Sequence, residues 1–297
     1  MSDMKGTIQE LLGQEIIIFE LKRKGYCNNA YYVETKSGKK VIVKEARADG
    51  ELKEQNSLQV EAHVIQKLSG LNLSLSLPEV CFVSKDPSMF GYAYIEGELL
   101  IDVWKDLSEE NRIRICQDLG VFHAELGREI TEAMTKELGV QINTYTGLHP
   151  EVEQEYKNAL IFTDIPEEWK TLARKAKIIF DKTLDLGIFQ FLHNDAHHEN
   201  IIIKDGEIAG IIDFGDSEFG EAAREFSRYI RDFPDHAEYI ISAYEAASGK
   251  KLSRKRLISN AFLSGLMENV EDYRKGGVDR ERAEKAVSKY QEMMRGF

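Results

Sequence analysis

An Asp-Gly pair between two β-branched runs constrains the fold of this chain more than any other feature. Ile201-Ile202-Ile203 and residues 208–212 are separated by Lys204-Asp205-Gly206-Glu207. Asp-Gly favours a two-residue hairpin turn with both central residues at positive φ, and β-branched residues favour strands. Because a hairpin brings its outer ends together, we expect Asn200, before the first strand, to lie close to Asp213, after the second.

The segments that flank this hairpin carry the residue types that phosphoryl transfer uses. They are His193-Asn194-Asp195-Ala196-His197-His198-Glu199-Asn200 and Asp213-Phe214-Gly215-Asp216. Transfer from a nucleoside triphosphate needs a carboxylate that orients a hydroxyl group, and an amide oxygen and a second carboxylate for metal. We assign these roles to Asp195, Asn200 and Asp213. Mg²⁺ is the expected metal, because it takes oxygen ligands and keeps several waters, so that no dedicated cage is required.

The histidines near Asp195 fit a supporting role better than a metal site. We interpret His193 as an imidazole that braces the loop through backbone hydrogen bonds. His197 and His198 are adjacent, so their side chains diverge in a loop, and no cysteine or further histidine has ligand spacing. Zinc is therefore not expected.

The N-terminal third of the chain favours a small β-rich lobe with one helix. Residues 16–19, 30–35 and 40–44 are candidate strands, and residues 56–69 have the apolar stripe of an amphipathic helix. Lys44 lies at the end of its strand, and Glu61 borders the stripe. In a kinase-type site, such a lysine contacts the α- and β-phosphates and is held by a glutamate of the next helix. We therefore predict an ion pair between Lys44 and Glu61.

Two further segments are candidates for nucleotide contact. In residues 25–29, the place of a phosphate-covering loop, Asn28 and Asn29 tolerate positive φ and are expected to expose backbone N–H groups where kinases use glycine. Residues 91–97 suit an extended connector whose backbone pairs with a purine. The connector predicts a nucleotide-binding lobe at residues 1–96. The remainder, residues 97–297, then forms a helical lobe with the catalytic loop, metal site and substrate site.

Composition is that of an intracellular enzyme. The 297 residues are long enough for two lobes, and three widely spaced cysteines argue against a disulfide framework. No apolar run approaches the ~20 residues of a membrane span. The net charge of −12 disfavours a nucleic-acid partner. It favours a cationic substrate, but it equally fits a surface that keeps the protein soluble. We expect a cytoplasmic monomer.

In chain order, these residues resemble the aminoglycoside phosphotransferases, most closely the 2″-phosphotransferase branch. The matching segments are Lys44, Glu61, residues 91–97, Phe122-His123-Ala124-Glu125-Leu126, residues 193–200 and residues 211–216. His-x-Asp-x-x-x-x-Asn and Ile-Asp-Phe-Gly-Asp are signature segments of that family. The resemblance implies an α+β, bilobal protein-kinase-like fold, with a small β-rich N-terminal lobe and a larger, mainly helical C-terminal lobe.

The resemblance also implies roles for single residues. Asp195 would orient the substrate hydroxyl and accept its proton, and Lys44 with Glu61 would anchor the triphosphate of ATP or GTP. The purine would meet the backbone of Ala93 and Ile95, with Tyr92 behind it. Two further positions match residues that support the catalytic loop in the family: His197 and Glu225.

By the same resemblance, the substrate is an aminoglycoside antibiotic and the enzyme is of the resistance type. A polycationic drug needs carboxylates, which we expect on the helices after residue 216. Three of them, at i, i+3 and i+4, share one helical face. A tyrosine would replace the tryptophan that the family often stacks near its substrate. The predicted substrate residues are Asp232, Asp235, Glu238, Glu268, Glu271, Asp272 and Tyr273.

Two alternatives remain open. The same machinery would serve a kinase for another small hydroxylated compound, such as choline, homoserine, a methylthio-sugar or a macrolide. A nucleotide-binding pseudokinase that acts as an interaction module is the other. The presence of Lys44, Asp195, Asn200 and Asp213 counts against the pseudokinase, because these are the groups that phosphoryl transfer requires.

Overall fold

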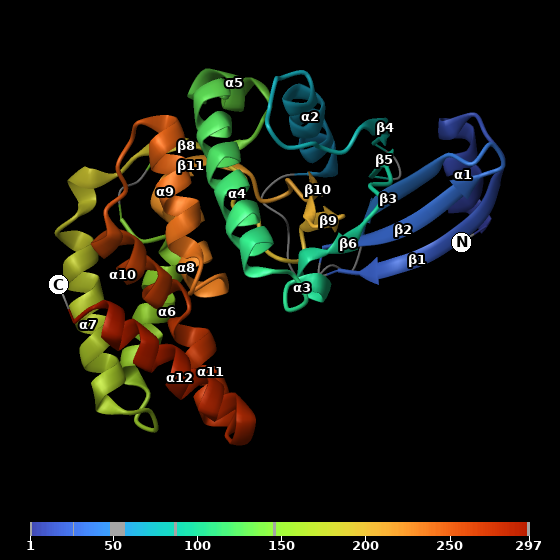
Figure 1. Ribbon diagram of the computed structural model, residues 1–297. Coiled ribbons are helices and arrows are strands. Elements are labelled where there is room, and N and C mark those ends of the chain that lie inside the picture. The colour runs from blue at the N-terminus through green and yellow to red at the C-terminus, as the bar shows by residue number, and fades with distance from the viewer. Residues whose placement is uncertain (1, 26, 48–56, 86–87, 145–146, 296–297) are drawn as a thin grey trace.

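The chain folds into a β-rich N-terminal lobe and a larger helical lobe (Figure 1). The computed structural model describes residues 2–25, 27–47, 57–85, 88–144 and 147–295. The bilobal α+β prediction is confirmed. Within these residues, no helix combines the length and the apolar character that crossing a membrane requires. The domain boundary between residues 96 and 97, the cytoplasmic location and the monomeric state stay predictions.

The N-terminal lobe is built on one antiparallel sheet of five strands in the order β1-β2-β3-β5-β4. Val33, Val41 and Val43 point to the same buried face, where helix α1 contributes Ile8. Residues 40–43 alternate between half-buried and buried, as expected for a strand with one face against the core. The elements are α1 (Ser2–Leu12), β1 (Ile16–Lys24), β2 (Asn28–Thr35), β3 (Lys40–Ala46), β4 (Val80–Ser84) and β5 (Met89–Ala93).

Helix α2 (Leu58–Ser69) is the helix predicted in this lobe. Its N-cap is Ser57, whose side chain accepts a hydrogen bond from the N–H of Val60. Leu58, Val64, Ile65 and Leu68 are buried beside Glu61, so the apolar stripe faces the sheet and carries the glutamate inward.

The connector between the lobes ends at Gly97, where only glycine fits. Its φ is 149°, and a Cβ atom there would lie 2.5 Å from the carbonyl oxygen of Ile203. The close approach allows β6 (Glu98–Leu99) to pair with β9 (Ile201–Lys204), which in turn pairs with β10 (Glu207–Ile211). The connector is therefore fastened directly to the predicted hairpin.

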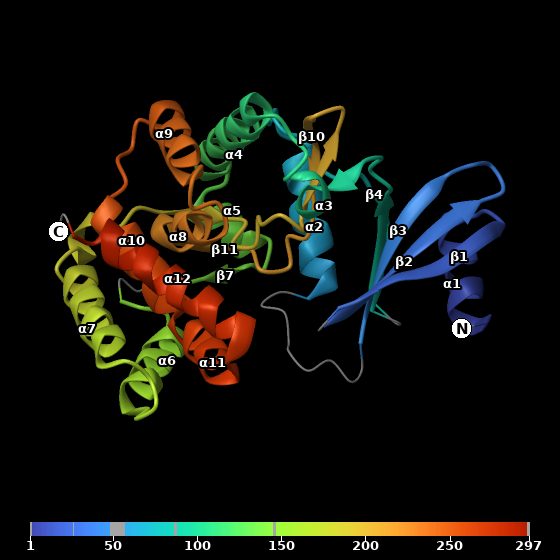
Figure 2. The same cartoon turned by 60° about the horizontal axis from the view of Figure 1, so that its bottom comes forward.

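The helical lobe is centred on helix α4 (Glu109–Glu129), which begins at its N-cap Ser108 and packs along α9 (Ala237–Ser248). Gly120 sits at their crossing, where a Cβ atom would lie 2.2 Å from the carbonyl oxygen of Ile240. Helices α6, α7, α10, α11 and α12 gather at the end away from the N-terminal sheet (Figures 1 and 2). The further elements are α3 (Leu100–Val103), α5 (Glu132–Glu137), β7 (Gln141–Ile142), α6 (Pro150–Ile161), α7 (Glu167–Asp181), η1 (Leu184–Leu186), β8 (Phe189–Leu192), β11 (Glu218–Glu221), α8 (Ala222–Asp232), α10 (Arg254–Ser264), α11 (Leu266–Lys275) and α12 (Gly277–Met293).

Candidate active site

The predicted hairpin is present and brings the two motif segments together. Asp205 and Gly206 have φ values of 54° and 79°, so both central residues of the turn are at positive φ, as predicted. At the outer end of the hairpin, the N–H of Ile212 donates to the carbonyl oxygen of Asn200 at 3.0 Å. Asn200 and Asp213 are therefore held at the same edge of the hairpin.

His193 braces the loop through backbone hydrogen bonds, as predicted. The side chain is buried, its Nδ1 accepts from the N–H of Asp195 at 3.2 Å, and its Nε2 lies 3.1 Å from the carbonyl oxygen of Ile212. Because Nδ1 accepts a hydrogen bond, the ring proton must be on Nε2, which donates to the carbonyl oxygen of Ile212. Burial lowers the pKa of His193, which keeps the ring in this neutral form. His193 thus ties Asp195 to the strand that delivers Asp213.

Glu225 holds the residue before Asp195. Asn194 is in the left-handed region, with φ 66°, and its N–H donates to Oε2 of Glu225 at 2.8 Å. Glu225 is 1% exposed, and burial raises its pKa. The contact with the loop that we expected of Glu225 is present.

The carboxylate of Asp195 is held from three sides. Asn200 donates from Nδ2 to Oδ2 at 2.8 Å, Arg228 places Nη1 2.9 Å from Oδ1, and Nε2 of His197 lies 3.4 Å from Oδ2. Burial raises the pKa of Asp195, but the hydrogen bond from His197 and the charge of Arg228 outweigh it, so that the pKa lies below its ordinary value. Asp195 is therefore an ionised, fixed acceptor.

Asn200 and Asp213 offer oxygen atoms that suit a magnesium ion. The Asn200 side chain faces two acceptors, the backbone carbonyl and the carboxylate of Asp195. Its donor atom Nδ2 must therefore point to them, and Oδ1 points away. Asp213, at φ 68°, uses Oδ1 for Lys44, and Oδ2 is the second oxygen. No group of three or more His, Cys, Asp or Glu side chains in the described ranges is arranged to hold a metal. Two oxygen donors without a cage fit Mg²⁺, which keeps waters and phosphate ligands.

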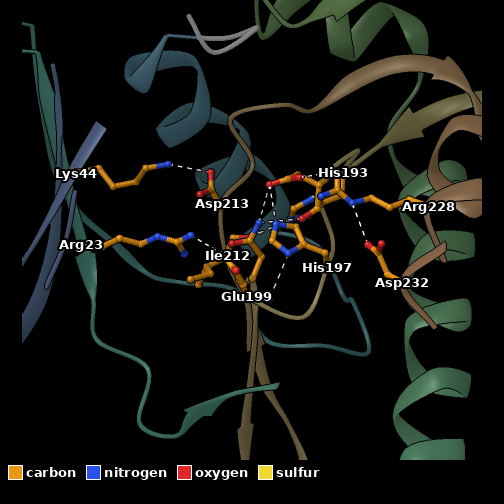
Figure 3. A network of polar contacts seen from close by, with 11 residues as sticks. Arg23, Lys44, His193, His197, Glu199, Ile212, Asp213, Arg228 and Asp232 are labelled. Atoms are coloured by element: carbon orange, nitrogen blue, oxygen red, sulfur yellow. Dashed lines mark hydrogen bonds and ion pairs between the residues drawn. The ribbon is translucent and has the colours of Figure 1, made fainter. Parts of the chain in front are cut away.

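The predicted ion pair between Lys44 and Glu61 is present. Nζ of Lys44 lies 2.8 Å from Oε2 of Glu61 and 2.9 Å from Oδ1 of Asp213. The Lys44 and Glu61 side chains are 8% and 0% exposed, so the pair is buried. Lys44 thus links α2 of the N-terminal lobe to the hairpin of the helical lobe (Figure 3). A second link, which the sequence did not lead us to expect, is the ion pair between Arg23 of β1 and Glu199 of the catalytic loop.

The residues predicted to contact the purine lie at the end of β5 and just after it. Tyr92 is buried against Phe90 in the core, consistent with a position behind the purine. The N–H of Ala93 donates to the carbonyl oxygen of Glu79 at 2.8 Å, so this N–H is already used within the N-terminal lobe. Ile95 follows in the connector. Contact of Tyr92, Ala93 and Ile95 with a nucleotide stays a prediction.

One expectation about the phosphate-covering loop is wrong. Neither Asn28 nor Asn29 has positive φ, because they are the first residues of β2 and pair in register with Ala46 and Glu45 of β3. Regular strand pairing overrides the local tolerance of asparagine for positive φ. Tyr26, the second residue of the predicted loop, lies outside the described residues.

A family model described as the phosphotransferase enzyme family matches residues 20–257. The chain belongs to this family. It is therefore a phosphotransferase with an alcohol group as acceptor. A comparison with curated protein sequences finds no match.

Solved structures share the fold of this phosphotransferase at low sequence identity. The GDP complex of an aminoglycoside 2′-phosphotransferase-IIIa mutant is 16% identical, with a TM-score of 0.70 over 98% of this chain and 96% of that chain. The GDP and kanamycin complex of APH(2″)-IIIa is 17% identical, with a TM-score of 0.68 over 99% and 98%. Macrolide 2′-phosphotransferase MphH from Brachybacterium faecium is 12% identical, with a TM-score of 0.68 over 96% of both chains.

The predicted substrate residues of the phosphotransferase do not form one acidic site. Three of them, Asp232, Glu268 and Asp272, line a cavity of about 310 Å³ together with Arg231, Arg282 and Lys289. Glu271 lines a different cavity, although it shares α11 with Glu268 and Asp272. The single acidic face expected from the i, i+3, i+4 spacing is therefore divided, because Asp272 is buried and Glu271 is exposed.

Most of these carboxylates are neutralised by basic partners within the phosphotransferase itself. The pairs are Asp232 with Arg228 and Arg231, Asp235 with Lys289, Glu238 with Arg254, and Asp272 with Lys275 and Arg282. Tyr273 packs edge-on against Trp169 and carries the guanidinium of Arg280 over its ring. A polycation would have to displace lysine or arginine side chains to reach these groups.

Arg228 is a contact of the Asp195 carboxylate that sequence reasoning missed. A signal was present: Arg224, Arg228 and Arg231 follow each other at i, i+4 and i+7, which places them on one face of α8. The opposite face, with Phe226, Tyr229 and Ile230, is buried.

Proposed function

We propose that this phosphotransferase moves the γ-phosphoryl group of a nucleoside triphosphate to a hydroxyl group of a small molecule, with Mg²⁺ as cofactor. One observation carries the proposal. Asp195, Asn200, Asp213 and Lys44 come from three separate stretches of sequence, and hydrogen bonds and ion pairs join Asn200 to Asp195 and Lys44 to Asp213 at one edge of the hairpin. Phosphoryl transfer is the chemistry that uses this set in this arrangement.

In the proposed reaction, Asp195 receives the hydrogen bond of the acceptor hydroxyl and orients its oxygen. A carboxylate with a lowered pKa is a weak base, which suits a loose transition state in which positioning and charge neutralisation contribute most. Lys44, held by Glu61, donates to the α- and β-phosphates. Oδ1 of Asn200 and the Asp213 carboxylate would hold Mg²⁺, which would offset the charge of the phosphate oxygens.

Related structures support a nucleotide donor without selecting one. The structures with the same fold include complexes with GDP and a ternary complex with ATP. We therefore propose ATP or GTP as the donor. The buried Tyr92 forms the back of the proposed purine site, so a Tyr92→Ala variant should change the ratio of ATP to GTP use.

The acceptor is proposed at the level of a small hydroxylated molecule. Structures with this fold hold kanamycin or gentamicin, and others are macrolide phosphotransferases. The aminoglycoside acceptor that the family resemblance implies stays a prediction, as does a role in antibiotic resistance. The pairing of Asp232, Asp235, Glu238 and Asp272 with arginine and lysine does not favour a polycation.

The test is phosphorylated product formed by the purified protein with Mg²⁺ and either ATP or GTP. The acceptor panel contains aminoglycosides, macrolides, choline, homoserine and small sugars, each analysed by mass spectrometry for a phosphate monoester. We expect acceptor-dependent product that is lost when EDTA removes Mg²⁺ and when Asn200 is replaced by alanine. Nucleotide binding without any Mg²⁺-dependent product would contradict the proposal and support the pseudokinase.

A further inference from the structure

An arginine-lined cavity opens beside the catalytic loop. It has a volume of about 240 Å³ and lies between the start of α6, one face of α8 and the C-terminal half of α10. Asn194, the neighbour of Asp195, is part of its wall, together with the three arginines of α8: Arg224, Arg228 and Arg231. The cavity therefore adjoins the site proposed for the acceptor hydroxyl.

The hydrogen bonds of two of these arginines leave donors for a ligand. Arg228 contacts Asp195 through Nη1 and Asp232 through Nε, and Arg231 contacts the same Asp232 through Nε (Figure 3 for Arg228 and Asp232). A guanidinium has five N–H donors. Among the described residues, these contacts use only one nitrogen of Arg231 and two of Arg228, so terminal N–H groups remain for an acceptor.

Two acidic residues line the cavity, Glu221 and Glu151. Glu221 is paired with the buried Arg256 through both of its oxygens. The Glu151 side chain is 85% exposed. Outside the lining, Glu218 is paired with Arg224, and Asp232 is shared by Arg228 and Arg231. The lining itself thus holds three arginines and two glutamates, one of which is already paired with Arg256.

The start of α6 also lies against the cavity, which Gly147, His149, Glu151 and Val152 line. The positive end of the helix dipole favours an anion, but the first turn also carries Glu151 and Glu153, and the N–H of Glu151 already donates to Nδ1 of His149. The arginines of α8, and not the helix end, are therefore the groups that would bind an anion.

We propose that this cavity binds the acid group of the acceptor, a carboxylate or a phosphate monoester, so that the acceptor is a small hydroxylated anion. The inference rests on the proposed function, because it assigns the cavity to the acceptor. Arg228 connects the two places: it lines the cavity, and its guanidinium lies 2.9 Å from the Asp195 carboxylate. Guanidinium groups bind both acid types with paired, charge-assisted hydrogen bonds. A polycation would instead bring ammonium groups against three guanidinium groups.

The first experiment compares acceptors that differ only in the acid group: glycerate with glycerol, gluconate with glucitol, and glucose 6-phosphate with glucose. For the wild type, we expect kcat/KM to be at least about tenfold higher for the acid of a pair. The carboxylate and phosphate pairs distinguish the two kinds of acid. Equal kcat/KM for all pairs, with efficient use of cationic acceptors, would overturn the inference.

Variants of Arg231 test whether the preference for an acid group arises in this cavity. Arg231→Gln should lower the acid-to-neutral ratio of kcat/KM by about 10- to 100-fold, mainly through KM, because a charge-assisted hydrogen bond is lost. Arg231→Lys keeps the positive charge but lacks the planar guanidinium group, so it should recover part of the wild-type ratio. Arg224→Gln should act in the same direction. Arg224, unlike Arg231, does not line the second cavity, which contains Asp232, Glu268 and Asp272. The matched control is Arg128→Gln, on exposed α4 surface beside Glu129, which should retain the wild-type ratio.

A binding measurement separates this inference from the proposed function. Calorimetry with inorganic phosphate, without nucleotide, should show binding that is weakened in Arg231→Gln more than in Lys44→Ala. Phosphate binding that depends on Lys44 and not on Arg231 would overturn the anion cavity. Product from neutral or cationic acceptors alone would overturn the anionic acceptor and leave phosphoryl transfer intact. Phosphate binding that depends on Arg231, without product from any acceptor, would contradict the proposed function and not the anion cavity.

Discussion

Arg228 of α8 holds its guanidinium 2.9 Å from Oδ1 of Asp195, a residue 33 positions earlier in the chain. Burial alone would raise the pKa of Asp195, and the His197 hydrogen bond and the Arg228 charge reverse this effect. A group with a depressed folded pKa contributes stability above its unfolded pKa, about 3.9 for aspartate, and loses it as the pH falls through the folded pKa. Asp195 therefore stays ionised throughout the neutral and mildly acidic range.

Replacing Arg228 should shift the acid limb of the pH profile. In Arg228→Gln, burial is no longer offset by the arginine charge, so the pKa of Asp195 rises and kcat falls at a higher pH than in the wild type. The measurement is kcat at saturating acceptor between pH 4 and pH 8. Superimposable profiles would show that Arg228 does not control the ionisation of Asp195.

Breaking the buried pair of Lys44 and Glu61 should cost much more stability than breaking an exposed pair. Lys44→Met leaves Glu61, whose side chain is 0% exposed, without this cation, and should lower the free energy of unfolding by about 3–5 kcal/mol. The control is Lys36→Met, whose pair with Glu15 is largely exposed and is worth about 1 kcal/mol or less. Urea unfolding measures both. Similar losses in the two variants would contradict the buried pairing.

Glu225 should support stability and activity together. In Glu225→Ala, the N–H of Asn194 loses its acceptor in a buried site while Asn194 is held at positive φ, which should cost about 1–3 kcal/mol. Turnover should fall in parallel because Asp195 follows directly. Glu225→Gln, which keeps a side-chain oxygen, should be milder in both measurements. Unchanged melting with selective loss of turnover would instead indicate a contact with substrate.

His123 should make the protein less stable in acid. The ring is fully buried on α4, close to the hydroxyl of Tyr229, and burial lowers its pKa to about 3. In the unfolded chain, the imidazole takes up a proton near pH 6.5, whereas the folded protein keeps the ring neutral down to about pH 3. The stability is therefore fully present above about pH 6.5 and is lost as the pH falls towards about 3. Urea unfolding at several pH values measures the loss. His123→Gln should reduce the slope by about 1.4 kcal/mol per pH unit, and an unchanged slope would contradict a neutral His123.

Local signals predicted those parts of the site that local chemistry determines. Asp205-Gly206 has the turn preference that the hairpin uses, and the hairpin alone is enough to bring Asn200 and Asp213 together. Strand alternation and a helical stripe placed Lys44 and Glu61, and the arrangement of a kinase-type site predicted that they pair. In each case, the preference of a short segment agrees with the fold.

The errors arose where a residue's partner is remote in sequence. Asn28 and Asn29 are drawn into β2 by its pairing with β3, which local φ preference does not show. Helical spacing grouped Glu268, Glu271 and Asp272, but it gave no information about Arg282, which pairs with Asp272. The contact between Arg228 and Asp195 depends on how α8 lies against the catalytic loop, so it could be seen only in the structure.

The measurement that tests the central claim most directly is single-turnover phosphoryl transfer by the wild type and by Asp195→Asn. Both are mixed with Mg²⁺, γ-labelled nucleoside triphosphate and the best acceptor of the panel, and labelled phosphate monoester is followed over time. The account predicts product from the wild type and a rate lower by about 10²- to 10⁴-fold in the variant, at similar melting temperature. Equal rates in both proteins would contradict the assignment of Asp195 as the residue that orients the acceptor hydroxyl.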